Sequence, residues 1–358
     1  MQSALKVKMR SLKEYLAKKI FDKKNKSGKT LDMDEAKSVL FFRNDDKIGD
    51  ITISTLLFRE IKKKYPDIEI IILCGRNNKE IIRYNNNVSR IYETGKSFFE
   101  DISVFRKLRK QNVSLAVDFY PFGQRFKHLL MLRIIAPEFL IGFYKNSYNI
   151  YDLSIEMDFF FLHISKWYEY LLGILKVENP DLKYDIVLTS KEERKALKLI
   201  EKCSAEHRVV LNPFAASRHR SFGYCKLKEL IGITEDEIDC CVFVLCHKKN
   251  GEKIKFLEND RTFVSGFESV LESAALIKYA DAVITPDTSI VHIASAFSKK
   301  TVALYLDYSN TYEKINIIWA PNNPNAVQLF VDTKNGSLEN DIKNIHSIDI
   351  VKALQKLL

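Results

Sequence analysis

Short apolar runs alternate with helix-forming segments along most of the chain, and this alternation constrains the fold more than any other feature. Residues 38–43 and 209–212, for example, are apolar runs typical of buried strands, and each precedes a loop and a helical segment. Strands joined through helices pair in parallel, with right-handed crossovers. Because the alternation occurs in both halves of the chain, we expect an α/β fold of two Rossmann-like, doubly wound domains that face each other across a cleft.

The length of 358 residues also favours two domains, because a single core rarely grows beyond about 250–300 residues. A linker that contains Pro180 separates the two series of strands and helices. We therefore predict one domain at residues 38–177 and a second at residues 178–358, which ends in a tail helix over residues 349–358. Within the first domain, residues 142–158 form a tyrosine-rich stretch without a clear strand pattern.

Residues 1–37 precede the first predicted strand as a basic extension. Residues 1–29 hold ten Lys and Arg against two acidic residues, so they carry +8 of the formal net charge of +10. Apolar residues recur there at helical spacing, with lysines between them: Leu5, Met9, Leu12, Leu16 and Ile20. Two interpretations of this amphipathic helix stay open. It binds an anionic membrane surface through residues 5–29, or it packs on the body with its basic face in solvent.

The rest of the composition argues against several classes of protein. Only +2 of net charge remains for the other 329 residues, which argues against a nucleic-acid-binding groove. No apolar run approaches the roughly 20 residues of a membrane span. The N-terminus is basic but lacks the apolar stretch and the cleavage site of a secretory signal. We therefore expect a cytoplasmic protein.

The six cysteines fit that expectation. They include no C-x-x-C pair, which argues against a zinc site. Cys74, Cys241 and Cys246 lie in or beside strand-like apolar runs. Free cysteines are among the most buried residues, and disulfides are rare in the cytoplasm. Reduced, buried thiols are therefore expected at these positions.

The segment from Ile284 to Ala296 has the layout of a strand, a sharp turn and a helix. Asp287 and Thr288 stand at the start of this helix, where their side chains can accept hydrogen bonds from free backbone N–H groups. Such a helix start also offers those N–H groups and the positive end of the helix dipole to a phosphate. The alternative is an ordinary capped strand–helix junction. His292, about one turn into the helix, faces the cleft or belongs to the core.

A second candidate is the loop 47–50, Lys-Ile-Gly-Asp, between the first strand and its helix. A carboxylate at the carboxyl end of a strand points into the crevice where open α/β sheets bind ligands. Asp50 is therefore a candidate general base for an acceptor hydroxyl, or else a helix cap. Asp45 and Asp46 are adjacent and do not form an Asp-x-Asp metal pair, so we interpret them as solvated loop residues.

A third candidate is the loop 212–222, which follows a strand and brings Arg218, His219 and Arg220 together. Guanidinium groups bind phosphate oxygens in a bidentate manner. Alternatively, the segment is a basic surface loop. The first strand is not followed by G-x-G-x-x-G, and G-x-x-x-x-G-K-[ST] does not occur in the sequence. A nicotinamide dehydrogenase and a P-loop nucleotidase are correspondingly disfavoured.

In this order and at this spacing, the three elements resemble the heptosyltransferase family of bacterial lipopolysaccharide synthesis, glycosyltransferase family nine. The resemblance covers residues 38–330. It rests on these segments: Phe42-Arg43 to Ile51, Tyr65 to Ile70, Val117-Asp118-Phe119, Ile141-Gly142-Phe143, His163 to Tyr170, Asn212 to Phe222, and Pro286 to Ala294. The last of these is similar to the family's Asp-Thr-Gly-x-x-His-x-Ala signature.

The resemblance implies a B-type glycosyltransferase fold. It also implies inverting transfer of a heptose from ADP-heptose to the inner core of a lipopolysaccharide or lipooligosaccharide, which is a lipid-linked oligosaccharide. Asp50 would be the general base, with Lys47 and Gly49 beside it on the acceptor side. The donor-binding residues that the resemblance implies are Ser217, Arg220, Glu252, Asp287, Thr288, Ser289 and His292, where Arg220 replaces a lysine that contacts the donor's phosphates. No metal and no cofactor is expected.

Three departures from the family pattern leave alternatives open. Ser289 and Phe214 stand where the family has glycine, and Phe222 stands where it has tryptophan. The first two side chains add bulk where a backbone would approach a phosphate closely. The alternatives are a transferase of the same fold that uses another nucleotide-sugar, and an inactive sugar-nucleotide-binding protein at the membrane. A lipid-anchored acceptor and the basic N-terminal helix together predict a peripheral protein on the cytoplasmic face of the inner membrane.

Overall fold

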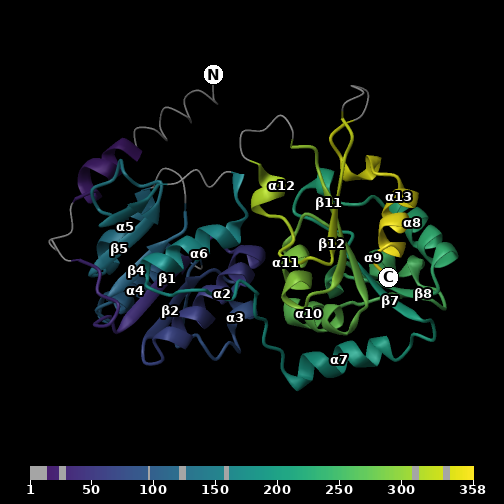
Figure 1. Ribbon diagram of the computed structural model, residues 1–358, viewed down its shortest axis with the longest axis horizontal. Coiled ribbons are helices and arrows are strands. Elements are labelled where there is room, and N and C mark those ends of the chain that lie inside the picture. Colours follow the sequence, from purple (N-terminus) through teal and green to yellow (C-terminus); the bar gives the residue numbers. More distant parts are fainter. Residues whose placement is uncertain are drawn as a thin grey trace.

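The computed structural model describes residues 14–23, 30–95, 97–120, 126–156, 161–308, 314–333 and 339–358. They form two α/β units that lie side by side, each built on a six-stranded parallel sheet with helices on its faces (Figure 1). We refer to these units as the N-terminal half and the C-terminal half. The two sheets confirm the predicted α/β fold with two doubly wound units.

The sheet of the N-terminal half has the strand order β3-β2-β1-β4-β5-β6. Its strands are β1 (Ser38–Arg43), β2 (Glu69–Cys74), β3 (Arg90–Glu93), β4 (Leu115–Asp118), β5 (Phe139–Phe143) and β6 (Leu153–Ile155). Its helices are α2 (Ile48–Lys64), α3 (Lys79–Ile82), α4 (Phe98–Arg109), α5 (Phe126–Ile135) and α6 (Ile164–Ile174). The strand order changes direction between β1 and β4. We call the carboxyl ends of these two strands the first switch point, because doubly wound sheets bind ligands at such places.

The sheet of the C-terminal half repeats this topology with the order β12-β11-β10-β7-β8-β9. Its strands are β7 (His207–Leu211), β8 (Cys240–Val244), β9 (Thr262–Val264), β10 (Ala282–Pro286), β11 (Lys300–Tyr305) and β12 (Ala326–Phe330). Its helices are α7 (Ser190–Ile200), α8 (Tyr224–Glu237), α9 (Lys248–Ile254), α10 (Val270–Tyr279), α11 (Ser289–Ala296), α12 (Ile315–Ile318) and α13 (Ser347–Gln355). The carboxyl ends of β7 and β10 form the second switch point.

Burial on both faces explains why the central strands are continuous apolar runs. All six residues of β1 are buried. Val39 and Phe41 belong to the hydrophobic cluster that includes α2, whereas Leu40 and Phe42 belong to the cluster that includes α4 and α5. A strand covered by helices on both sides is therefore apolar in its interior. In β1, the polar residues are confined to the two ends, Ser38 and Arg43, and Arg43 lies at the first switch point.

Two strands at the sheet edges were not predicted. Residues 142–158, expected to lack a strand, contain β6, and residues 326–330 form β12. β6 is a three-residue strand, and none of the residues of β12 is fully buried. Short, half-buried edge strands carry little apolar pattern of their own, and their pairing with β5 and β11 defines them.

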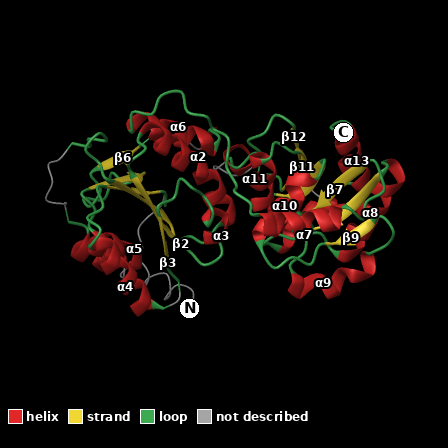
Figure 2. Cartoon of the chain, turned by 90° about the horizontal axis from the view of Figure 1, so that it is seen from below, coloured by secondary structure: helices red, strands yellow, loops and turns green. Residues whose placement is uncertain are grey.

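The two halves meet where α2 and α11 begin, and both views place these helices at the junction (Figures 1 and 2). A Cβ atom added to Gly49 would lie 2.9 Å from Cδ2 of His292 and 3.6 Å from the Cα of Ser289. Further along α2, Arg59 donates a 2.6 Å hydrogen bond to Asp185 in the segment that joins the halves. The first turns of α2 and α11 therefore lie against each other.

The described part of the N-terminal extension includes a helix over residues 14–21 that packs on the N-terminal half. Ala17 is buried, and the rings of Phe21 and Phe126 lie 5.3 Å apart. The two described residues of the predicted apolar row face solvent, because Leu16 is 46% exposed and Ile20 is 52% exposed. The earlier part of that row lies outside the described residues. Within the described ranges, each helix is too short or too polar to cross a membrane.

The cysteine pairing corrects one expectation. Cys203, after α7, forms a disulfide with Cys241 in β8, and their Cα atoms are 5.8 Å apart. The prediction of a reduced thiol is therefore wrong for Cys241. The fold brings the end of α7 over β8, across 38 residues of sequence, and no local pattern reports that proximity. Cys74 and Cys246 are buried thiols, as predicted.

Candidate active site

The second switch point places the start of α11 directly after β10. Thr288 caps this helix, and its side chain accepts a 3.3 Å hydrogen bond from the N–H of Ile290. Asn212, at the end of β7, donates from its amide to Thr285 at 3.0 Å and to Thr288 at 3.1 Å. The two strand ends are thereby tied together. Ser289 is the first residue of the helix, at the end that attracts anions.

Arg220 and Asp287 form an ion pair beside this helix start. Nη1 of Arg220 lies 3.0 Å from Oδ2 of Asp287 and 3.0 Å from its backbone oxygen. Burial raises the pKa of Asp287, and Arg220 acts in the opposite direction. Arg220 belongs to a short 3-10 turn, η2 (Arg218–Arg220), in which Arg218 is exposed. Ser217 precedes this turn, but its side chain makes no capping hydrogen bond.

Asp50 lies in the first turn of α2 and is buried at the first switch point. Its Oδ2 atom is 3.7 Å from the ammonium group of Lys47, which is itself largely exposed. Burial raises the pKa of Asp50, and the nearby Asp45 raises it further, while Arg43 and Lys47 act to lower it. A carboxylate with a raised pKa is a stronger proton acceptor than an ordinary aspartate.

Arg43 is a buried cation behind Asp50, at the end of β1. Its Nε donates to Ser54 at 2.8 Å, and another guanidinium nitrogen donates to the hydroxyl of Tyr168. The guanidinium carbon lies 3.8 Å from the ring centroid of Phe119. These contacts hold a positive charge in a fixed position inside an aromatic enclosure.

A cavity of about 460 Å³, which we call the Asp50 cavity, opens in front of these groups. Its ionisable lining residues are Arg43, Asp45, Lys47, Asp50, Asp118 and His128. Its aromatic lining residues are Phe42, Phe119, Tyr120, Phe143, Trp167, Tyr168 and, from the C-terminal half, Trp319. A mostly apolar wall with a few convergent polar groups is the usual form of a binding site for an organic molecule.

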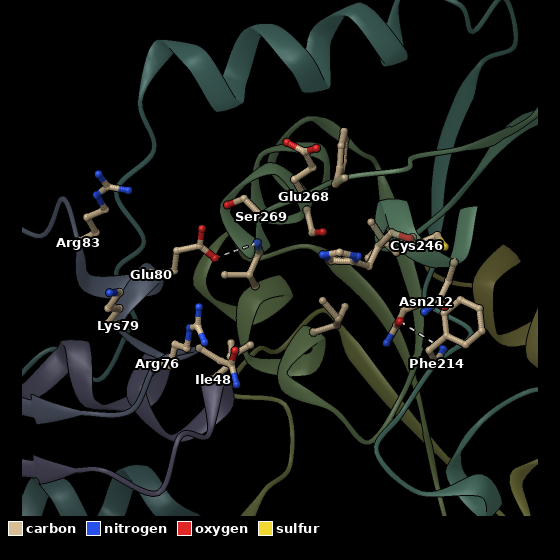
Figure 3. Close-up of a pocket in the computed structure, with 18 of the residues that line it drawn as sticks. Ile48, Arg76, Lys79, Glu80, Arg83, Asn212, Phe214, Cys246, Glu268 and Ser269 are labelled. Atoms are coloured by element: carbon tan, nitrogen blue, oxygen red, sulfur yellow. Dashed lines mark hydrogen bonds between the residues drawn. The ribbon is translucent and has the colours of Figure 1, made fainter. Parts of the chain in front are cut away.

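A larger cavity of about 950 Å³ lies between the two halves, and we call it the interdomain cavity (Figure 3). The N-terminal half contributes Ile48, Arg76, Lys79, Glu80 and Arg83 to one wall. The opposite wall comes from the strand ends and helix starts of the C-terminal half, including Asn212, Phe214, Cys246, Glu268 and Ser269. The cavity is large enough for a nucleotide-sized ligand.

The structure brings most of the predicted site residues together. Gly49, next to Asp50 in the first turn of α2, lies against the start of α11, which holds Ser289. Thr288 caps the same helix, beside the Arg220–Asp287 pair. Phe214 lines the interdomain cavity, and Phe222 is buried in the core of the C-terminal half, where a large ring serves packing.

Two predicted donor-binding residues lie elsewhere. The side chain of Glu252 is 86% exposed on α9, near Lys255, and it does not line the interdomain cavity. His292 is buried at the junction of the halves, with Tyr184 and Trp319 each 6.2 Å from its ring centroid. Burial lowers its pKa to about 3, and its Nδ1 has no hydrogen-bond partner among the residues that the structure describes. His292 is therefore a neutral junction residue in this arrangement.

A buried ionic cluster at the first switch point was not predicted as part of the site. Oδ2 of Asp118 lies 2.9 Å from Nε2 of His128. Burial acts to raise the pKa of Asp118, but His128, Lys145 and the Tyr151 hydroxyl overcome it and lower the pKa to about 2. Burial also lowers the pKa of Lys145, which is fully enclosed, to about 8. The sequence carried one local signal for this cluster, which is Asp118 at the end of an apolar strand.

One group in the described ranges has the spacing of a metal site. Ligand atoms of His219, Glu339 and Asp341 lie within 4.8 Å of one another. Asp341 already pairs with Lys343 at 3.1 Å and with His219 at 3.4 Å, and His219 and Glu339 are exposed. We interpret the group as an ion-pair cluster, because its buried carboxylate is already matched by cations.

The chain is similar to known proteins both in sequence and in fold. The family model described as glycosyltransferase family 9 (heptosyltransferase) matches residues 102–344. A curated relative from Escherichia coli strain K12, named "Putative lipopolysaccharide heptosyltransferase 4", is 26% identical over 346 residues, which cover 88% of this chain and 89% of the relative.

Three solved structures show the same fold. The family 9 glycosyltransferase from Veillonella parvula DSM 2008 is similar with a TM-score of 0.73 at 14% identity, covering 92% of this chain and 99% of that one. E. coli ADP-heptose lps heptosyltransferase II gives 0.69 at 15% identity, with coverage of 89% and 98%. E. coli heptosyltransferase WaaC with ADP gives 0.65 at 12% identity, with coverage of 90% and 100%. With a family model that spans most of the sequence, this chain belongs to glycosyltransferase family 9, the heptosyltransferase family, and is a glycosyltransferase.

Proposed function

We propose that the protein is an inverting glycosyltransferase that moves a heptose from ADP-heptose to a lipopolysaccharide or lipooligosaccharide inner-core acceptor. The observation that carries the proposal is the meeting of the two switch points. Asp50 lies in the first turn of α2, and Gly49 beside it lies against Ser289 at the start of α11. A candidate base and an anion-binding helix start thus share one site.

The proposed reaction needs a proton acceptor and a stabilised leaving group. Asp50 accepts the proton of the acceptor hydroxyl as that oxygen bonds to the anomeric carbon of the heptose. The bond from this carbon to the diphosphate breaks, and its electron pair leaves with ADP. The N–H groups at the start of α11 and the guanidinium of Arg220 are placed to stabilise the added negative charge. In this scheme Lys47 stays beside Asp50 on the acceptor side.

ADP-heptose is the favoured donor because one structural relative is an ADP-heptose heptosyltransferase and another was solved with ADP. The second candidate is a transferase that uses another nucleotide-sugar, because the ring of Phe214 forms part of the interdomain cavity wall. Calorimetric titration with ADP, UDP, GDP and CMP separates these cases. If ADP binds most tightly of the four nucleotides, ADP-heptose is supported as the donor. Binding of a nucleotide without release of sugar from any nucleotide-sugar supports an inactive binding protein instead.

The role of Asp50 is tested by Asp50→Asn, which keeps the shape and removes the basic carboxylate. Transfer is expected to fall by about 100-fold or more, the range for loss of a general base, while ADP binding is unchanged. Asp67→Asn is the control, since Asp67 is an exposed carboxylate of the same half outside the Asp50 cavity. Wild-type transfer rates in Asp50→Asn would overturn the assignment.

We also propose that residues 5–29 bind an anionic membrane surface at the cytoplasmic face of the inner membrane. In the described helix, Leu16 and Ile20 point away from the body, beside the exposed Lys19 and Lys23. An apolar row flanked by lysines is the pattern of an interfacial helix. The double variant Leu16→Gln, Ile20→Gln is expected to lose sedimentation with anionic vesicles. Ile348→Gln, an exposed apolar change in α13, serves as the control.

A further inference from the structure

Arg76 lies at the boundary between two cavities of the N-terminal half. It lines the interdomain cavity, beside Ile48 (Figure 3). It also lines a second cavity of about 660 Å³ that extends towards His128 and Lys127. Ile48 begins α2, two residues before Asp50. Arg76 therefore lies in the interdomain cavity beside the first turn of the helix that carries Asp50.

The loop that carries Arg76 is fixed by hydrogen bonds to Asp46 and Asn78. Oδ1 of Asp46 accepts from the N–H groups of Asn77 at 2.6 Å and Asn78 at 3.2 Å. The amide of Asn78 accepts from the N–H of Gly75 at 2.9 Å and donates to the backbone oxygen of Arg43 at 2.7 Å. Asp46 is thus a loop clamp, and its interpretation as a solvated residue is wrong. The clamp holds the backbone on both sides of Arg76.

Two other cations around the junction are matched by partners. Arg220 pairs with Asp287, and Lys79 pairs with Glu93. In contrast, Arg76 makes no hydrogen bond or ion pair with any residue that the structure describes. Arginine is the side chain best suited to bidentate binding of phosphate, and its charge persists at any working pH.

We propose that Arg76 binds the diphosphate of the nucleotide-sugar donor from the N-terminal half. The inference rests on the proposed function. When the bond from the anomeric carbon to the diphosphate breaks, the leaving group gains one negative charge, and Arg220 already shares its charge with Asp287. Arg76 supplies a further positive charge from the wall of the interdomain cavity. It acts as a donor-binding residue that joins the two halves around the leaving group.

The test compares Arg76→Gln with Arg109→Gln in the full-length protein. Arg109 is the matched control because it is an exposed arginine of the same half, at the end of α4, and it lines neither of the two cavities. Arg76→Gln is expected to weaken ADP binding and to lower the transfer rate, each by about 10- to 100-fold, the range for one charge-assisted contact. Arg76→Lys should restore part of both losses, because lysine restores the positive charge but not the bidentate geometry of the guanidinium group.

The outcomes separate this inference from the proposed function. If wild-type protein neither binds ADP nor transfers sugar, the proposed function fails first. If wild-type protein does both and Arg76→Gln behaves as Arg109→Gln does, only the role of Arg76 is overturned. A rise in the acceptor KM with unchanged ADP affinity also overturns it, because Arg76 would then bind the acceptor. Circular dichroism and the unfolding midpoint confirm that each variant is folded.

Discussion

The two switch points have the same topology but hold charge in different ways. At the first, ionisable groups are buried and paired with one another, as in the contact between Asp118 and His128. At the second, short polar side chains such as Asn212 and Thr288 tie the strand ends together, and a helix start is left to attract an anion. A buried ionic network shifts pKa values, whereas a capped helix start offers fixed N–H groups. Proton transfer and anion binding thus suit different halves of the molecule.

Removal of a carboxylate from each switch point would give the largest contrast. Asp118→Ala removes the buried carboxylate that acts on the fully enclosed Lys145 and on the partly buried His128, so the free energy of unfolding should fall by about 3–5 kcal/mol. Asp287→Ala should cost clearly less, because Arg220 is partly exposed and can be solvated. Urea denaturation of both variants measures the difference. Equal losses would show that burial does not distinguish the two switch points.

Removal of the cation at the second switch point should affect binding more than stability. Arg220→Gln leaves Asp287 without its partner beside the proposed phosphate site, so ADP affinity should fall by about 10- to 100-fold. Arg218→Gln, in the same turn but exposed, is the control. Titration calorimetry compares the two. Unchanged ADP affinity in Arg220→Gln would move the phosphate site away from this arginine.

The junction between the switch points should be sensitive to acid. Burial lowers the pKa of His292 from an ordinary value of 6.5 to about 3, with Tyr184, Trp319, Gly49 and His163 around it. Between these values the unfolded chain takes up a proton that the folded protein does not. Stability is therefore present above pH 6.5 and falls as the pH drops towards 3, by up to about 1.4 kcal/mol per pH unit.

Denaturation of wild type and His292→Asn at pH 7, 6 and 5 measures this dependence. The wild type should lose stability more steeply than the variant. His346→Asn, at an exposed histidine before α13, should retain the wild-type slope. Parallel slopes of stability against pH for wild type and His292→Asn would show that another group causes the loss of stability at low pH.

The smallest expected effect comes from the contact between the first turns of α2 and α11. Gly49→Ala places a methyl group 2.9 Å from the ring of His292, so the ring or the junction must shift slightly. Alanine also favours the helix by about 1 kcal/mol, so the unfolding free energy should change little. Transfer should fall by less than about tenfold, with ADP affinity unchanged. An increase in the transfer rate would argue that this contact hinders the reaction.

Local patterns were sufficient to predict the central strands and the three candidate loops. A strand buried on both faces is apolar until its end, and the residues that follow it, such as Asp50 and Asp287, lie at the carboxyl edge of the sheet. For this reason the sequence indicated both sides of the site. The edge strand β12, in contrast, has no buried residue and depends on its neighbour.

Contacts between distant segments were beyond the reach of sequence patterns. The clamp of Asp46 on Asn77 spans 31 residues, and the contact of Gly49 with His292 joins the two halves. The sequence pattern around His292 is the same whether its side chain contacts a ligand or the other half of the molecule. A helical pattern does not show what packs against the helix. Sequence patterns were therefore enough to predict the two doubly wound units and the strand ends that carry Asp50 and Asp287. Pairing and burial of charges, including the lack of a partner for Arg76 among the described residues, depend on neighbours that are remote in sequence, so they emerge only once the chain is folded.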